Sequence, residues 1–263
     1  MKLPFDCTQR RRIYLMRHAD AQYIQPDGTR ATDSRTVPLT PKGHDEAAGM
    51  RDLLADVAFD RAICSGLRRT VETARIIIGQ RPLSLEIISA LEEIRGGDAI
   101  ARANLSPVDY AYAMFMAGEP GACYASGEPF TDFYGRIVPA FDAIVKATNW
   151  TRLLLVAHGG VNRAILSSIV SSGLASFGAF EQDSACLNII DIDHTENGGL
   201  AIKCKPNSNC AGATLGKSMF ERIRHQLVHK QRQRHRLLGI NSKVIALNVQ
   251  CDIPPSMNFL QAG

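Results

Sequence analysis

Residues 152–157, which read Arg-Leu-Leu-Leu-Val-Ala, constrain the fold more than any other segment of the sequence. A short, almost entirely apolar run is typical of a strand in a parallel sheet, because helices cover both faces of such a sheet. Residues 161–170 follow with the apolar spacing of a helix. A buried strand that leads into a helix predicts an α/β domain.

The chain before and after this strand repeats the alternation. Further strands are expected at residues 12–17, 61–64, 84–88, 187–193 and 200–204, and further helices at residues 41–57, 67–78 and 130–146. Thr40 and Pro41 are residue types preferred at the N-cap and first position of a helix, and Gly79 is the type preferred just after a helix. Together these elements predict a three-layer α/β/α domain around a mostly parallel central sheet.

Two segments depart from this pattern. Residues 91–130 mix glycine, proline and aromatic residues irregularly, which is typical of an inserted cap. Residues 217–263 carry eight Lys and Arg against two acidic residues, a net charge of +6, so the remaining chain has a net charge of −2. We therefore divide the chain into a domain at residues 1–216, with the cap at about 91–130, and a basic C-terminal extension at residues 217–263.

The composition favours a soluble protein. Hydrophobic residues make up 45% and charged residues 21%, as in ordinary globular proteins, and no run approaches the roughly 18 to 20 apolar residues of a membrane-spanning helix. The N-terminus lacks the pattern of a secretory signal, so we expect a cytoplasmic protein with no membrane partner. A solvated tail is the favoured interpretation of the extension, with nucleic acid or an anionic membrane surface as the alternative partner. The sequence does not predict the oligomeric state.

Three polar clusters follow strands of the predicted sheet. They are Arg17-His18, the segment from Ser65 to Arg69, and His158-Gly159-Gly160. Ligands of an open α/β sheet bind beyond the carboxyl ends of its strands, where the N-termini of helices favour anions. Arginine adds planar donors that match phosphate oxygens. The three clusters therefore predict one phosphate site.

The sequence contains no motif that would bind a metal or a cofactor at this site. It has no carboxylate cluster for magnesium, no Cys-x-x-Cys pair among its seven cysteines, and no glycine-rich loop of the nucleotide-binding kind. Without a metal, chemistry at phosphorus needs a nucleophile and positive charge from side chains. A neutral histidine supplies the nucleophile, and the arginines with a second histidine supply the charge.

Five motifs occur in order within residues 13 to about 193. They are Leu15-Met16-Arg17-His18-Ala19, Pro38-Leu39-Thr40-x-x-Gly43, Ser65-x-Leu67-x-Arg69-x-x-Glu72-Thr73-Ala74, Leu91-Glu92-Glu93, and Val156-Ala157-His158-Gly159-Gly160-x-x-Arg163. In this set and order they resemble the histidine phosphatase superfamily, which includes the phosphoglycerate mutases. The resemblance implies a phosphoglycerate mutase-like fold, with residues 1–216 as the catalytic domain.

The resemblance also implies a metal-independent phosphatase that hydrolyses a small phosphomonoester through a phosphohistidine on His18. Arg17, Arg69 and His158 would hold the phosphoryl oxygens, with His158 also counted among the catalytic residues. Glu93 would protonate the leaving oxygen and then take a proton from the attacking water. His18 must keep its attacking nitrogen unprotonated, and we expect a backbone carbonyl to hold its other nitrogen.

Several alternatives stay open at this point. Glu92 competes with Glu93 as the acid, and Arg163 is expected to be a structural ion-pair partner rather than a phosphate ligand. Ala19 replaces the usual glycine after the Arg-His pair, a modest change. Ile24 stands where the mutases carry an asparagine that touches the phosphate, which disfavours a mutase.

Three other functions compete with a phosphomonoester phosphatase. Two are enzymes, a protein phosphohistidine phosphatase and a phosphotransferase of the phosphoglycerate mutase type. The third is a catalytically idle phosphate-binding scaffold that docks through its basic tail.

Overall fold

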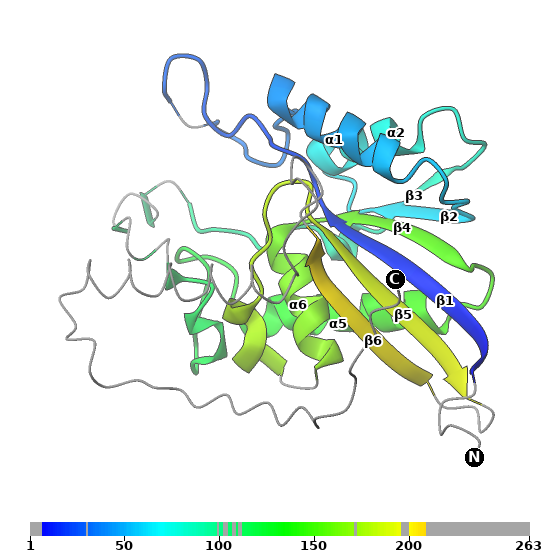
Figure 1. The fold of residues 1–263 in the computed structure, drawn as a ribbon. Coiled ribbons are helices and arrows are strands. Elements are labelled where there is room, and N and C mark those ends of the chain that lie inside the picture. The colour runs from blue at the N-terminus through cyan, green and yellow to red at the C-terminus, as the bar shows by residue number, and fades with distance from the viewer. Residues whose placement is uncertain are drawn as a thin grey trace, which may run out of the picture. The chain divides into compact units, whose positions relative to one another are not determined.

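Six strands form one sheet in the protein, whose structure here is a computed structural model (Figure 1). They are β1 (Cys7–Arg17), β2 (Arg61–Cys64), β3 (Leu85–Ile87), β4 (Arg152–Ala157), β5 (Leu187–Thr195) and β6 (Leu200–Ser208), in the spatial order β3-β2-β4-β1-β5-β6. The first four pair in parallel, whereas β5 runs antiparallel to both β1 and β6. The predicted mostly parallel sheet is confirmed.

The described residues are 7–29, 31–98, 100–101, 105–106, 109, 112–170, 173–195 and 200–208. The basic extension predicted at residues 217–263 lies outside them. The division into a domain and an extension therefore stays a proposal. Among the residues that the structure describes, no helix combines the length and the apolar character needed to cross a bilayer.

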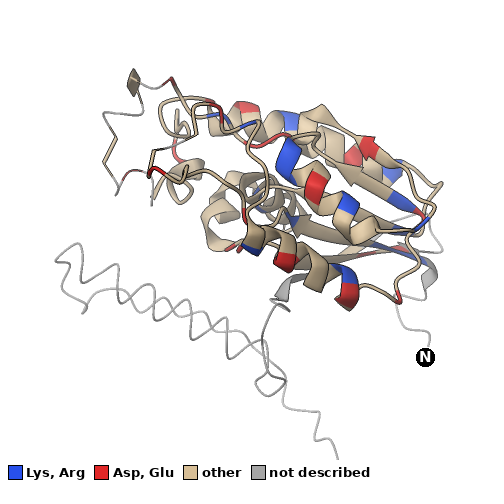
Figure 2. Ribbon diagram, turned by 90° about the horizontal axis from the view of Figure 1, so that it is seen from above, with Lys and Arg blue, Asp and Glu red and all other residues tan. Residues whose placement is uncertain are grey.

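Helices cover both faces of the sheet (Figure 1). Because side chains alternate along a strand, Leu154 and Val156 of β4 pack with α1 (Pro41–Leu53) and α2 (Arg68–Ile78). Leu153 and Leu155 face the opposite cluster, which contains α5 (Phe130–Lys146) and α6 (Gly159–Ile169). This arrangement confirms the predicted three layers. Acidic and basic residues are interspersed along the described helices (Figure 2).

Helix α1 begins as predicted but ends earlier. The Thr40 hydroxyl accepts a hydrogen bond from the Gly43 amide at 3.0 Å, which caps the helix at its N-terminus. The predicted end at residue 57 is wrong, since the helix stops at Leu53. The Arg81 guanidinium donates to the carbonyls of Leu54 and Ala55 at 2.8 and 3.0 Å. These bonds satisfy carbonyls left free where the helix ends.

Strand β1 is longer than its predicted range of 12–17. Arg10, which lies outside the predicted range, and Arg12, its first residue, each form a two-pronged ion pair with an aspartate of β5. Their Nε atoms lie 2.6 Å from Asp193 and Asp191, respectively. Charges paired across the two strands extend the strand to Cys7.

Between β3 and α5 the described chain contains two short 3₁₀ turns, η1 (Ser89–Leu91) and η2 (Met116–Gly118). Leu91 and Ala117 are buried in the same apolar cluster as α5 and α6. A third 3₁₀ segment, η3 (Gly173–Ala179), follows α6 and contributes Phe177 to this cluster. The role of residues 91–130 as a cap over a site stays a proposal.

Candidate active site

The carboxyl ends of β1, β4 and β2 place the three predicted polar clusters side by side. These strands are neighbours and parallel, so all three ends meet at one edge of the sheet. The rings of His18 and His158 have centroids 5.3 Å apart. Arg69 Nε lies 3.2 Å from His18 Nε2. The structure therefore brings together His18, Arg69 and His158, as the sequence predicted.

His18 is buried and held in one tautomer. Its Nδ1 lies 2.7 Å from the Ala19 carbonyl oxygen, which can only accept, so Nδ1 carries the hydrogen. The expected carbonyl partner is thus confirmed. Nε2 accepts a hydrogen bond from Arg69. Burial, followed by the charges of Arg17 and Arg69, lowers the pKa of His18 well below 6.5. His18 is therefore neutral at neutral pH, with a lone pair on Nε2.

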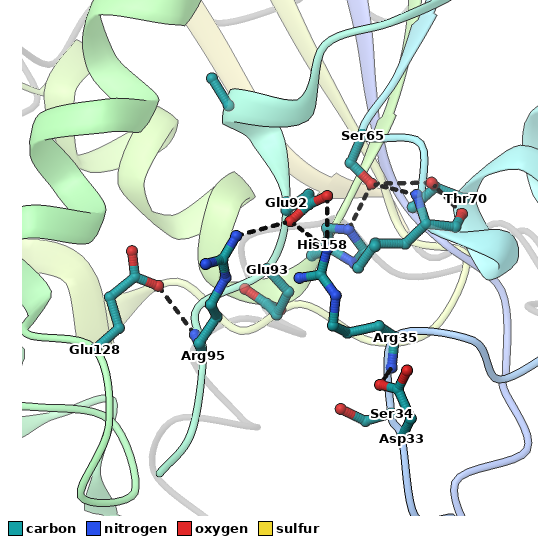
Figure 3. Close-up of polar contacts among 12 residues, drawn as sticks. Asp33, Ser34, Arg35, Ser65, Thr70, Glu92, Glu93, Arg95, Glu128 and His158 are labelled. Atoms are coloured by element: carbon teal, nitrogen blue, oxygen red, sulfur yellow. Dashed lines mark hydrogen bonds and ion pairs between the residues drawn. The ribbon is translucent and has the colours of Figure 1, made fainter. Parts of the chain in front are cut away.

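His158 is fully buried, and a chain of hydroxyls sets its tautomer (Figure 3). Thr70 donates its hydroxyl hydrogen to the Leu67 carbonyl, so it accepts from Ser65 Oγ at 3.0 Å. Ser65 Oγ in turn accepts from His158 Nε2 at 2.7 Å. Burial, with Arg69 as the next cause, lowers the pKa of His158 well below 6.5. The proton of the neutral ring thus sits on Nε2, and Nδ1 carries a lone pair.

Backbone carbonyls orient the two arginines. Arg17 Nη1 donates to the Gln182 carbonyl at 2.6 Å, and Arg69 Nη1 donates to the Ser34 carbonyl at 2.8 Å. Among the described residues, the buried atoms Arg17 Nε and His158 Nδ1 have no hydrogen-bond partner. A buried polar atom normally finds one. Arg17 Nε is a donor suited to bind an oxyanion, and His158 Nδ1 can donate to one only once it is protonated. The lone pair of His18 Nε2 is suited instead to attack an electrophilic centre.

Glu93 lies against the helix that follows His158. One of its carboxylate oxygens accepts from the Gly160 amide at 3.1 Å and the other from the Ile94 amide at 3.0 Å. A Cβ atom on Gly160 would lie only 2.4 Å from Glu93 Oε1. The glycine therefore permits this close approach, and it brings the carboxylate to the residue two positions after His158.

Glu92 points instead into an ion-pair cluster (Figure 3). Its carboxylate lies 2.8 Å from Arg35 Nη2 and 3.2 Å from Arg95 Nη2. Burial raises the pKa of Glu92, but hydrogen bonds from both arginines outweigh this and lower it overall. A carboxylate kept ionised by two arginines is poorly suited to donate a proton, so the geometry favours Glu93 over Glu92 as the acid.

The contacts of Arg163 and the exposure of Ile24 bear on two further expectations. Arg163 donates hydrogen bonds to the Phe177 and Gly178 carbonyls at 3.1 and 3.2 Å, and the charges of Glu181 and Glu93 act on it. Its expected role as a structural ion-pair partner stays a prediction. Ile24 is 47% exposed, and its side chain has no hydrogen-bonding group.

Within the described ranges, no group of three or more His, Cys, Asp or Glu side chains is placed to hold a metal ion.

Sequence reasoning missed two residues at this edge. The Tyr23 hydroxyl lies 3.4 Å from His18 Nε2, and its ring lies 5.5 Å from the Arg69 guanidinium carbon. Arg136 of α5 binds the backbone beside Glu93 at the carbonyls of Ala90, Glu92 and Glu93. Neither belongs to one of the five motifs. An aromatic residue five positions after His18 was the one available signal for Tyr23.

This chain is similar to one protein family and to three known proteins that are described here. The family model of the histidine phosphatase superfamily (branch 1) matches residues 13–204. Adenosylcobalamin/alpha-ribazole phosphatase of Escherichia coli strain K12 is 29% identical over 185 residues, 69% of this chain and 90% of that protein. 2-Carboxy-D-arabinitol-1-phosphatase of Triticum aestivum is 26% identical over 188 residues, 70% of this chain and 38% of that protein. The crystal structure of the alpha-ribazole phosphatase of Shigella flexneri superposes with a TM-score of 0.60 and 25% identity, covering 77% of this chain and 99% of that one.

Proposed function

The chain belongs to the histidine phosphatase superfamily and is a phosphatase, and we propose that it hydrolyses a small phosphomonoester through a phosphohistidine on His18. The observation that carries the proposal is the state of His18. Its Nδ1 hydrogen is used by the Ala19 carbonyl, its ring is neutral, and Nε2 meets the Arg69 guanidinium. A neutral imidazole beside fixed positive charge is an activated nucleophile for an anionic phosphorus centre.

In the first step, His18 Nε2 forms a bond to phosphorus and the bond from phosphorus to the alcohol oxygen breaks. The electron pair leaves with that oxygen, which takes a proton from Glu93. In the second step, the Glu93 carboxylate takes a proton from water, and the water oxygen bonds to phosphorus. The N–P bond breaks, its electron pair returns to Nε2, and inorganic phosphate leaves.

The proposed phosphate ligands are Arg17, Arg69 and His158. The arginines supply the positive charge that a metal ion would otherwise supply, so the reaction that we propose needs no metal. His158 Nδ1 meets a phosphoryl oxygen either as acceptor from a protonated oxygen or, once protonated, as donor. A phosphate dianion favours the protonated form of a nearby histidine or carboxyl group.

Two relatives support the substrate class, since one is an adenosylcobalamin/alpha-ribazole phosphatase and the other is a 2-carboxy-D-arabinitol-1-phosphatase. Hydrolysis is favoured over phosphoryl transfer of the phosphoglycerate mutase type, because Ile24 offers no hydrogen bond to a phosphoryl group. Among phosphatases, an ester is favoured over a phosphoramidate. A leaving alkoxide needs a proton donor, and Glu93 lies in place for that role.

The test is a panel of phosphorylated metabolites and p-nitrophenyl phosphate, assayed for phosphate release with EDTA present. Wild type should turn over at least one alkyl phosphomonoester, and His18→Ala should lose that activity by at least about 10³-fold. His44→Ala is the matched control, because His44 is exposed on α1, and it should keep full activity. A phosphoenzyme labile in acid and stable in alkali should be trapped on wild type and on His44→Ala, but not on His18→Ala. Activity that disappears with EDTA, or survives in His18→Ala, contradicts the proposal.

A further inference from the structure

Arg136 uses every N–H group of its guanidinium, three on the segment around Glu93 and two on Glu128. Nη1 donates to the carbonyls of Ala90 and Glu92, both at 2.7 Å, and Nη2 donates to the Glu93 carbonyl at 3.3 Å. The remaining hydrogen bonds, from Nε and Nη2, run to the Glu128 carboxylate at 2.8 and 3.0 Å. Five N–H groups thus meet three carbonyls and one carboxylate, a set that the fork of arginine can satisfy and the point charge of lysine cannot.

Glu128 holds the other side of the same segment. Its carboxylate accepts from the Arg95 amide at 3.0 Å, and its own amide donates to the Arg95 carbonyl at 2.7 Å (Figure 3). Arg136 and Glu128 therefore bind the chain before and after Glu93. Residues 92–98 follow η1 and are neither helical nor in a strand. These side-chain contacts therefore replace the backbone hydrogen bonds of a helix or sheet that would otherwise fix the segment.

The same helix also supports the surface on which the Glu93 carboxylate rests. Phe133, one turn before Arg136 on α5, lies with its ring 4.8 Å from the guanidinium carbon. Its Cζ would be 3.3 Å from a Cβ on Gly160, whose amide binds Glu93. Helix α5 thus fixes both the backbone of Glu93 and the environment of its carboxylate partner.

We propose that Arg136, together with Glu128, is a positioning residue that aims Glu93 at the leaving oxygen. Arg136 touches neither substrate nor phosphate in this proposal, which rests on the proposed role of Glu93 as the acid. A carboxyl group displaced by about 1 Å loses much of its catalytic effect. Loosening the fork should therefore impair proton delivery while it leaves attack by His18 intact.

The test measures how strongly kcat depends on the leaving group of the substrate. An alkyl phosphate needs its leaving oxygen protonated, whereas p-nitrophenolate leaves without that help. In Arg136→Lys, kcat for the best alkyl substrate of the panel should fall about 10- to 100-fold, and kcat for p-nitrophenyl phosphate by less than about threefold. Glu128→Gln, which weakens the ion pair, should change the ratio of the two rates in the same direction. Because both substrates report on the same folded molecules, this ratio does not depend on the fraction that folds.

Arg61→Lys is the matched control. Arg61 also forms a two-pronged ion pair, with Glu86 at 2.9 and 2.8 Å, but at the amino end of β2 rather than at the carboxyl edge. It should leave the ratio unchanged. Equal losses on both substrates in Arg136→Lys, or no loss, overturn the positioning role.

Glu93→Gln separates this failure from failure of the proposed function. If Glu93→Gln changes the ratio and Arg136→Lys does not, the positioning role alone is wrong. If Glu93→Gln leaves the ratio unchanged, Glu93 is not the acid, and the proposed mechanism fails at that step.

Discussion

Replacing Gly160 with alanine tests the placement of Glu93 by a single methyl group. The added Cβ would lie 2.4 Å from Glu93 Oε1 and 3.3 Å from Phe133 Cζ. Ordinary contacts begin at 3.4 Å, so the carboxylate oxygen must retreat by about 1.0 Å, while the ring needs to yield by only about 0.1 Å. The end of a glutamate side chain can make this move at small cost to the fold.

The effect on catalysis should be much larger than the effect on stability. A displacement of about 1 Å from a productive geometry costs on the order of 10²-fold in rate. We therefore expect kcat for an alkyl phosphomonoester to fall about 100-fold in Gly160→Ala, with kcat for p-nitrophenyl phosphate within about fivefold of wild type. Alanine in place of a helical glycine stabilises the protein by about 0.4–1 kcal/mol, because it restricts the unfolded chain. This gain should offset the small cost of moving the Glu93 side chain, so the melting temperature should stay near the wild-type value.

Steady-state phosphate release on both substrates, with thermal unfolding of the same preparations, measures these changes. Gly49→Ala is the control, because Gly49 lies in the exposed face of α1 and a Cβ there meets nothing within 4 Å. It should gain stability and keep both rates. Alkyl phosphate turnover within about threefold of wild type in Gly160→Ala would refute the reasoning about Glu93.

Three further predictions concern the histidines and one helix contact. Ser65→Ala leaves the buried Nε2–H of His158 without its acceptor. The free energy of unfolding, measured by thermal unfolding, should fall by about 1–3 kcal/mol, and inhibition by inorganic phosphate should weaken. Unchanged inhibition would argue against His158 as a phosphate ligand. The pKa values of His18 and His158 are lowered in the folded state, so the unfolded chain binds more protons below pH 6.5. The free energy of unfolding should then fall with decreasing pH, by up to about 1.4 kcal/mol per pH unit for each histidine. Urea unfolding between about pH 7.5 and 5.5 measures this change. A free energy of unfolding that does not vary over this range would mean that both rings gain protons freely in the folded protein. In Gly43→Ala the new Cβ would lie 2.0 Å from the Asp20 carbonyl oxygen, so we expect a loss of at least about 2 kcal/mol in chemical unfolding, and a stable variant would contradict the close packing of that backbone.

Elements with a clean hydrophobic signal could be predicted from the sequence with their boundaries. Strand β4 and helix α5 begin and end where the sequence places them, because both bury a continuous apolar surface. Strand β1 was predicted too short because the arginines before Ile13 are compensated by aspartates more than 170 residues away. A long-range charge pair leaves no signal in the local sequence.

The site shows the same division between local and distant information. Residues attached to strand ends, such as His18 and His158, could be predicted because the topology of a parallel sheet brings those ends together. Choosing between Glu92 and Glu93 needed the ion pairs of one and the amide contacts of the other. Arg136 could not be found, since its main partners are carbonyls, which every residue possesses.

The sheet order also bears on how the chain folds as it is synthesised. Strand β1, which ends in the nucleophile, lies between β4 and β5, and its first parallel partner begins 145 residues later at Arg152. At about 5–20 residues per second, translation separates these strands by on the order of 10 s. Through that interval the nascent chain carries the apolar run at residues 13–16 of β1 with open strand edges and no neighbours, a state prone to aggregation. Assembly of the catalytic edge is therefore a late event that depends on contacts of high sequence separation, and we expect slow refolding to accompany it.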